Sequence, residues 1–234
     1  MAPGKRSTLK YPLIAREGRL YILIALGAAI VVTAAAGWLW SIPLWLAFLL
    51  VLQFFRDPPR EIPLEPGAVL SPAHGKVVAI GEVDDPYLKR RVRRISIFMN
   101  VFCVHSNRMP VGGVVRARWY YPGRFFNAAL DKASEHNERN ALWIRTAGGI
   151  DVVVVQVAGL IARRILCYVD KGDPVAGGER YGFIRFGSRL DVYLPPQAEP
   201  SVALGQWVRG GSDIIARIDT ASYLDEPPRA ATEG

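Results

Sequence analysis

The sequence contains one long stretch without any charged residue or histidine, the 36 residues 20–55. One membrane-spanning helix needs roughly 20 apolar residues, so this stretch is too long for one span and too short for two full ones. Its middle, residues 37–43, combines glycine, serine and proline with two tryptophans, which favours a chain break at a lipid–water interface. We therefore expect two short helices, over residues 20–36 and 44–55, that form a hairpin dipping into or barely crossing a membrane.

Basic residues flank the uncharged stretch on both sides. Five of the first 19 residues are basic and only Glu17 is acidic, while Arg56 and Arg60 follow the stretch. The positive-inside rule then places both flanks on the cytoplasmic side. We predict a basic cytoplasmic N-terminus at 1–19, a hairpin in the cell membrane at 20–55, and a domain at 56–234 on the cytoplasmic side. A cleaved signal peptide fits poorly, because the stretch is too long and too far from Met1. A buried helical hairpin of a soluble protein is the alternative.

The chain is basic, with a formal net charge of +8 and a second group of basic residues at 89–94. Such a group can bind nucleic acid. Beside a membrane anchor, attraction to anionic lipid headgroups is the simpler interpretation, at roughly 1 kcal/mol per basic residue near the surface. We therefore expect an anionic membrane surface as partner and no nucleic acid. A solvated face without any partner is the alternative.

Residues 56–234 have the size of one domain and begin with a proline-rich neck at 56–63. Only two segments resemble helices, 127–140 and 159–165, whereas β-rich segments lie at 76–83, 95–104, 141–146 and 150–157. The four valines 152–155 are typical of a strand buried on both faces. This pattern predicts a mainly β (α+β) domain, either a β-sandwich or a hybrid barrel. Residues 202–216 resemble half of the barrel of biotinyl and lipoyl carriers, but no lysine follows Lys171 to bear a cofactor.

Common catalytic motifs are absent from the sequence. It contains no Walker motif, no GxGxxG, no HExxH and no GxSxG. The three histidines, His74, His105 and His136, lack the spacing of metal ligands, and Cys103 and Cys167 are too few for a disulfide framework. We expect no metal site. Two Gly-Ser pairs remain as candidates for chemistry, at 187–188 and 211–212.

The segment around the first pair, residues 185–195 (RFGSRLDVYLP), resembles the self-cleavage segment of the short prokaryotic type of phosphatidylserine decarboxylase. Further segments agree in order and spacing, namely FFRDPPR at 54–60, VHSNRMP at 104–110, FNA at 126–128 with NER at 137–139, and QVAGLIARR at 156–164. The resemblance extends from about residue 10 to residue 218. Several ordered motifs are more specific than any one of them alone.

The resemblance implies a pyruvoyl-dependent enzyme. In that family the serine hydroxyl attacks the preceding glycine carbonyl, and the chain divides into a β chain, here 1–187, and an α chain, here 188–234. Ser188 would become a covalent pyruvoyl group, whose ketone forms a Schiff base with phosphatidylserine and accepts electrons during decarboxylation to phosphatidylethanolamine. Gly187 suits this cleavage site, because a residue without Cβ tolerates strained backbone. The second pair, Gly211-Ser212, is interpreted as a plain turn.

The resemblance also assigns roles to other residues. His105 matches the acid–base histidine, and a pKa near neutrality fits that role. His74 stands where the family usually has an aspartate assigned to self-cleavage, so it is a candidate base for Ser188. Cys103 stands where another aspartate is usual, and His136 is expected to face solvent. Apart from the resemblance, the candidates for binding the substrate are Arg108, Arg163 and Arg164. Arg163 and Arg164 could donate to the lipid phosphate, and a salt-bridged surface role is the alternative for both.

Two other functions stay open at this point. The same chemistry on another serine-headed lipid, such as an archaetidylserine-like ether lipid, has an identical headgroup. A non-catalytic membrane adaptor on the same scaffold would explain His74 and Cys103. The sequence also leaves a homo-oligomer open.

Overall fold

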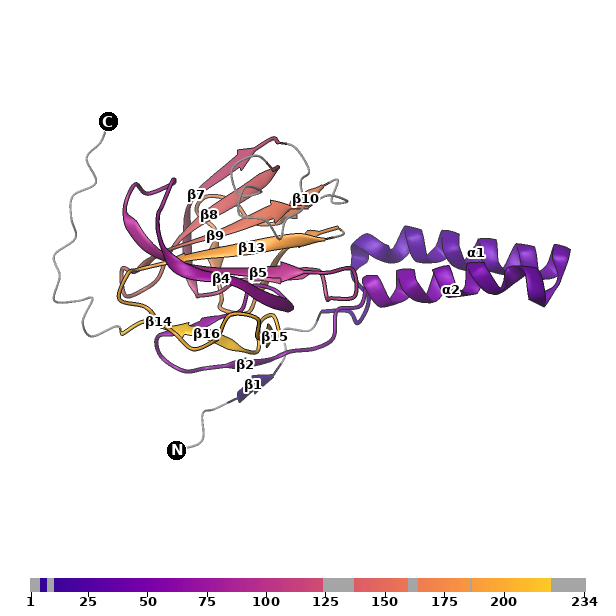
Figure 1. The fold of residues 1–234 in the computed structure, drawn as a ribbon, viewed down its shortest axis with the longest axis horizontal. Coiled ribbons are helices and arrows are strands. Elements are labelled where there is room, and N and C mark those ends of the chain that lie inside the picture. Colours follow the sequence, from indigo (N-terminus) through magenta and orange to yellow (C-terminus); the bar gives the residue numbers. More distant parts are fainter. Residues whose placement is uncertain (1–4, 8–10, 124–136, 160–163, 186, 220–234) are drawn as a thin grey trace.

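The computed structural model describes residues 5–7, 11–123, 137–159, 164–185 and 187–219 (Figure 1). Its N-terminal part is a pair of antiparallel helices, α1 (Arg19–Ala36) and α2 (Trp38–Phe54), after a short 3-10 turn at Arg16–Gly18. Gly37 alone forms the turn between them, with a left-handed φ of 84°. The expected break at 37–43 was therefore too wide, because one positive-φ residue suffices. The second helix begins at Trp38 and contains Pro43.

The helix pair projects from the β domain instead of lying in its core (Figure 1). At 1.5 Å per residue, the 18 residues of α1 span roughly 27 Å, close to the thickness of a hydrocarbon layer. Within the pair, only Ala29, Ser41 and Phe54 are buried. Residues 16–36 are long and apolar enough to cross a membrane, and 38–54 form a shorter apolar helix. This arrangement argues against the alternative of a buried hairpin and suggests membrane association.

A side-chain hydrogen bond joins the two helices, and two further bonds lie within them. Trp45 Nε1 donates to Thr33 Oγ1 across the pair at 3.2 Å, and Thr33 itself donates to the Ala29 carbonyl at 2.7 Å. Ser41 donates to the Trp38 carbonyl at 2.8 Å. These bonds satisfy the few polar groups of an otherwise apolar pair, as a membrane interior requires.

The remaining chain is mainly β, which confirms the predicted fold class. An antiparallel eight-stranded sheet curls into a half-barrel in the order β11-β7-β8-β9-β13-β5-β4-β15 (Figure 1). Its strands are β4 (Gly75–Asp84), β5 (Arg91–Met99), β7 (Gly113–Tyr121), β8 (Arg139–Arg145), β9 (Asp151–Ala158), β11 (Pro174–Val175), β13 (Ser188–Leu194) and β15 (Trp207–Val208). The valines 152–155 of β9 are all buried, as their run predicted.

Three smaller sheets complete the domain. They are β10-β12-β6, β14-β16-β3 and β1-β2, formed by β1 (Lys5–Ser7), β2 (Glu61–Pro63), β3 (Ala68–Leu70), β6 (Ser106–Arg108), β10 (Ile165–Cys167), β12 (Arg180–Ile184), β14 (Glu199–Pro200) and β16 (Ile214–Arg217). The main apolar core lies between these sheets and one face of the large one, and includes Ile97, Leu142, Val154 and Leu190.

Several sequence-based boundaries need correction. The strand expected at 95–104 is β5, which ends at Met99, and residues 101–103 form a turn. The helix expected at 127–140 falls largely outside the described residues, but Arg139 and Asn140 already belong to strand β8. Most of the helix expected at 159–165 also lies outside them, and Ile165 begins β10. Strand pairing across a sheet determines these ends, and local composition does not record it.

The basic group at 89–94 does not lie beside the helices. It occupies the tip of the β4–β5 hairpin, at the end of β5 opposite to Met99, far from α1 and α2 (Figure 1). Some of its charges are paired with carboxylates of the same hairpin, among them Arg93 with Glu82 at 3.2 Å and Arg91 with Asp84 at 3.4 Å. This placement gives no support to the expected attraction of the group to lipid headgroups, which stays a prediction.

Candidate active site

Ser188 is the first residue of β13 and lies inside the large sheet. It is aligned with Met99 of β5 on one side and Ala158 of β9 on the other. The residue is fully buried, and its Oγ has no hydrogen-bond partner among the described residues. A buried hydroxyl without a partner is costly, so it needs an explanation in function.

Gly187 adopts a backbone conformation that other residues rarely adopt. Its φ is +56°, in the left-handed region, although open space surrounds the place where a Cβ would be. The glycine is therefore required by conformation and not by crowding. This positive-φ glycine directly precedes the buried hydroxyl of Ser188.

His105 follows the turn after β5 and is fully buried. Its Nδ1 lies 2.9 Å from the Cys103 carbonyl oxygen, and because a carbonyl only accepts, Nδ1 carries the proton. Nε2 is therefore a proton acceptor, and it is buried without a partner among the described residues. The ring packs on Phe54 with centroids 4.0 Å apart, and on Phe183 at 6.3 Å.

Burial lowers the pKa of His105 to about 4, although the Cys103 carbonyl opposes this shift and the charges of Arg56 and His74 add to it. The expectation of a pKa near neutrality is therefore wrong. The physical reason is complete burial of the ring beside Phe54 and Phe183, which the sequence did not indicate. At pH 7 the imidazole is neutral and can accept a proton.

Ser188 and His105 lie at the end of the β domain that faces the helix pair. In the loop before Ser188, Arg185 donates to Tyr21 of α1 at 2.9 Å. In the turn before His105, the Phe102 carbonyl accepts from Arg56, just after α2, at 3.0 Å. A small apolar cluster, which includes Ala15, Phe54, Phe55 and Phe183, joins the base of the helices to this end of the domain.

His74 lies close enough to His105 for its charge to oppose protonation of that ring. Burial lowers the pKa of His74, and the neighbouring charges of Arg60 and Arg56 lower it further, while Asp213 raises it. Its Nδ1 is buried without a partner among the described residues. The structure therefore brings His74 into the surroundings of His105 as a second neutral imidazole.

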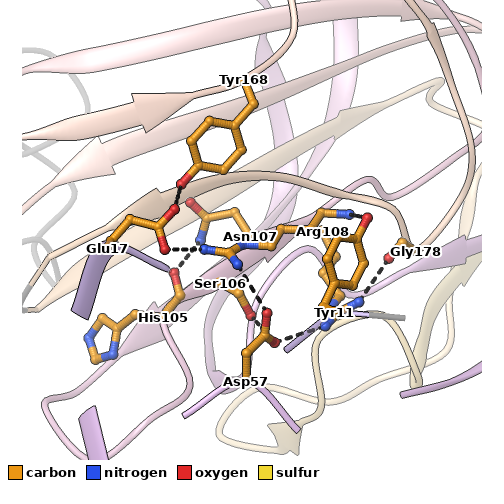
Figure 2. A network of polar contacts seen from close by, with 10 residues as sticks. Tyr11, Glu17, Asp57, His105, Ser106, Asn107, Arg108, Tyr168 and Gly178 are labelled. Carbon is orange, nitrogen blue, oxygen red and sulfur yellow. Dashed lines mark hydrogen bonds and ion pairs between the residues drawn. The ribbon is translucent and has the colours of Figure 1, made fainter. Parts of the chain in front are cut away.

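Arg108 does not face a substrate in this structure. It is 2% exposed and donates to Asp57 Oδ1 at 2.9 Å (Figure 2). Asp57 also accepts from Ser106 at 2.8 Å and lies 3.4 Å from Arg180. The charge of Arg108 is thus used inside the protein, so its contacts give no support to a substrate-binding role.

The network in Figure 2 continues from Asp57 to the segment before α1. Arg180 donates to Glu17 at 2.6 Å, and Tyr168 donates to the same carboxylate. Although burial opposes it, these hydrogen bonds and the charge of Arg180 lower the pKa of Glu17. Sequence reasoning missed Glu17, Asp57 and Arg180, and the only signal was the place of Asp57 within the FFRDPPR motif.

Replacing Asp57 by asparagine should destabilise the fold by about 3–5 kcal/mol, because removal of one partner leaves buried arginine charges uncompensated. The comparison is best made in a Ser188→Ala background, so that both proteins are single chains, by urea unfolding in detergent. The matched control is Asp84→Asn, which removes a carboxylate from the exposed pair with Arg91 and should change little. Equal effects of the two substitutions would contradict the role given to the buried network.

The other predicted residues contribute less. Arg164 is exposed, whereas Arg163 and His136 lie outside the described residues. Gly211 and Ser212 form a turn, as predicted. Cys103 and Cys167 are free thiols, and within the described ranges no cluster of metal-ligating side chains occurs.

Comparison with known proteins identifies the family of this chain. A model of the family "Phosphatidylserine decarboxylase" matches residues 47–216. A phosphatidylserine decarboxylase proenzyme of Aromatoleum aromaticum is 61% identical over 208 residues, which cover 89% of this chain and 97% of that protein. Proenzymes of the same name from Nitrosomonas eutropha and Nitrosomonas europaea are 59% and 58% identical over 208 residues, or 89% of this chain and 96% of each relative. The chain belongs to the phosphatidylserine decarboxylase family.

Proposed function

We propose that this chain cleaves itself between Gly187 and Ser188 and then decarboxylates phosphatidylserine to phosphatidylethanolamine. The observation that carries the proposal is the buried, unpaired Oγ of Ser188 directly after a left-handed glycine. The names of the related proenzymes support both the maturation and the substrate.

The self-cleavage uses atoms of the chain alone. Ser188 Oγ attacks the Gly187 carbonyl carbon and replaces the amide nitrogen, which gives an ester and a free amine at residue 188. Loss of the Cα proton and cleavage of the Cβ–O bond then release the Gly187 carboxylate and leave a dehydroalanine. Water converts the dehydroalanine to a pyruvoyl group with loss of ammonia. Each step needs a base, and neutral imidazoles supply one.

His105 is the base that we assign to this work. The Cys103 carbonyl fixes its tautomer, so Nε2 presents a lone pair, and the low pKa keeps that lone pair free at pH 7. Nε2 and Ser188 Oγ are not hydrogen-bonded to each other here, so a rearrangement precedes the transfer. Such contacts often tighten only in the reacting complex. His74, also neutral, is the alternative base.

The surroundings of position 188 fit a pyruvoyl group. Strands β5 and β9 pair with β13 along its length, so the new N-terminus stays in place after cleavage. When formed, the pyruvoyl group supplies an electron sink while carbon dioxide leaves the substrate. The chain contributes apolar walls at Phe54 and Phe183, which exclude water, and a neutral His105 that holds or moves a proton at Nε2.

We further propose that the helix pair anchors the enzyme in the cell membrane, with residues 1–19 and 56–234 on its cytoplasmic side. The helices are apolar, exposed to their surroundings and flanked by arginines. Because Ser188 and His105 lie at the helix-facing end of the domain, insertion of α1 and α2 would hold the site at the level of the lipid headgroups.

The mass of the purified protein tests the proposal. We expect two fragments that divide between Gly187 and Ser188, and an α chain whose blocked N-terminus gains hydrogen on borohydride reduction. Decarboxylation is then measured side by side on ester and ether serine lipids to decide the substrate. A single uncleaved chain without activity would instead favour the membrane adaptor.

A further inference from the structure

We propose that Arg60 binds the phosphate of the lipid headgroup; this assignment rests on the proposed function above. Arg60 lies in the neck between α2 and β2, six residues after the last residue of α2. It is half-buried, yet it makes no hydrogen bond or ion pair with the residues that the structure describes.

Neighbouring arginines differ from Arg60 in this respect. Arg108 is paired with Asp57 at 2.9 Å, and Arg209 with Asp213 at 3.0 Å. Arg56 donates to two carbonyl oxygens, those of Gln53 and Phe102. Burial lowers the pKa of Arg60, and the charges of Arg108, Arg209 and Arg56 lower it further. The charge of Asp57, which is paired with Arg108, raises it. A partly buried cation among other cations favours an anion as its partner.

Arg60 lines a cavity of about 490 Å³ together with Arg209 and Ser212. Two carboxylates, Glu61 and Glu65, also line this cavity. Glu65 is paired with Arg217 at 2.6 Å, and Glu61 raises the pKa of Arg209, after the larger effect of Asp213. Neither carboxylate is paired with Arg60 among the described residues, so its guanidinium can receive an anion.

One wall of the cavity lies close to His74. A Cβ on Gly210 would lie 2.9 Å from the Ala73 carbonyl carbon and 3.0 Å from His74 N, so the cavity wall that includes Arg209 and Ser212 packs on the backbone of His74. Arg60 is also the nearby charge with the largest effect on the pKa of His74. An anion held by Arg60 would thus lie near His74.

The chemistry of decarboxylation favours the phosphate over the carboxylate of the substrate. The carboxylate leaves as neutral carbon dioxide, so a cation bound to it would stabilise the ground state more than the transition state. The phosphate keeps its charge throughout the reaction. An arginine on the phosphate therefore strengthens binding without slowing the chemistry, and its planar donors match phosphate oxygens.

The test compares substrates with and without a phosphate, using full-length enzyme in mixed micelles. Arg60→Gln should lower kcat/KM for phosphatidylserine about 10- to 100-fold, the usual value of a hydrogen bond to a charged group, and mainly through KM. The same variant should leave kcat/KM unchanged for an O-acylserine, which has the amine and carboxylate but no phosphate. Arg60→Lys should retain part of the preference.

Two controls separate this role from others. Arg91→Gln makes the same change of charge at the far hairpin tip and should leave both substrates unaffected. Self-cleavage of Arg60→Gln, read by intact mass, should be complete, because that step involves no phosphate. Equal losses on both substrates, or incomplete cleavage, would overturn the assignment. If the wild type neither cleaves itself nor acts on either substrate, the proposed function itself fails.

A final arm distinguishes the lipid phosphate from free phosphate. Glycerophosphoserine should inhibit the wild type more strongly than serine, and Arg60→Gln should abolish the difference. Inorganic phosphate should compete only weakly, because it lacks the serine part. Strong competition by inorganic phosphate with no effect of Arg60→Gln on the lipid would overturn the assignment to the headgroup.

Discussion

Replacing Ser188 by alanine should leave the chain whole at 25.8 kDa and abolish decarboxylation. The reason is that Oγ is both the nucleophile of the cleavage and the atom whose loss creates the pyruvoyl group. The rest of β13 is unchanged, and alanine fits a position whose hydroxyl makes no hydrogen bond to the described residues. The fold should therefore persist, and even gain stability slightly, because an unpaired buried hydroxyl is removed. Intact mass and release of carbon dioxide from labelled phosphatidylserine measure the two effects.

The matched control is Ser212→Ala, which alters the other Gly-Ser pair of the chain. Gly211 also has a left-handed φ, of 75°, but Ser212 lies in a turn and not at the start of a buried strand. This variant should cleave as completely as the wild type. A Ser188→Ala chain that still divides in two, or a Ser212→Ala chain that does not, would show that the cleavage site is misassigned.

Features that depend on neighbours in sequence were predicted well. The uncharged stretch predicted two helices, because absence of charge over 36 residues is a property of the chain itself. The valines 152–155 predicted a strand buried on both faces, and all four are buried in β9. Helix boundaries were less accurate. Gly37 could turn the chain alone, so Pro43 was absorbed into α2.

Features that depend on distant residues could not be predicted. Asp57 compensates the charge of Arg108, 51 residues later in the chain, and this pairing decides that Arg108 is no surface cation. The low pKa of His105 comes from burial of its ring, next to Phe54 at the end of a helix expected to lie in a membrane. The basic group at 89–94 lies far from the helices only because β5 runs toward them. Tertiary packing determines the pairing of Arg108, the pKa of His105 and the place of the basic group.

The topology is compatible with the proposed self-cleavage. The proposed α chain, residues 188–234, would begin with β13, which pairs with β9 on one side and β5 on the other. It would also contain β15 and β16, which pair with β4 and β3 of the proposed β chain. Because hydrogen bonds and the shared core hold these strands, a break at 187–188 would not separate the two chains.

Replacing His105 by glutamine should slow self-cleavage about 100- to 10,000-fold, the usual contribution of a positioned general base. Glutamine preserves a neutral, polar side chain but offers no comparable base. The rate is measured as conversion of freshly synthesised full-length chain into two fragments. His74→Gln is the matched comparison. If His74→Gln blocks cleavage and His105→Gln does not, the base is His74.

The pH dependence gives an independent test of His105. With a pKa of about 4 instead of the ordinary 6.5, the imidazole stays neutral well below pH 6.5. The cleavage rate of the wild type should therefore be level from pH 8 to about pH 5 and fall below that, as Nε2 takes up a proton. A fall centred near pH 6.5 would contradict the buried environment of His105.

The protonation of His105 should also make the folded protein less stable at low pH. Between pH 6.5 and about 4 the unfolded chain binds a proton at His105 that the folded chain does not bind. The folded protein therefore loses stability as the pH falls through this window. This loss is absent above pH 6.5 and is complete below about pH 4. Measured in a Ser188→Ala background, His105→Gln should lose less stability than its parent between pH 6.5 and 4. An identical acid sensitivity in both would show that another group governs it.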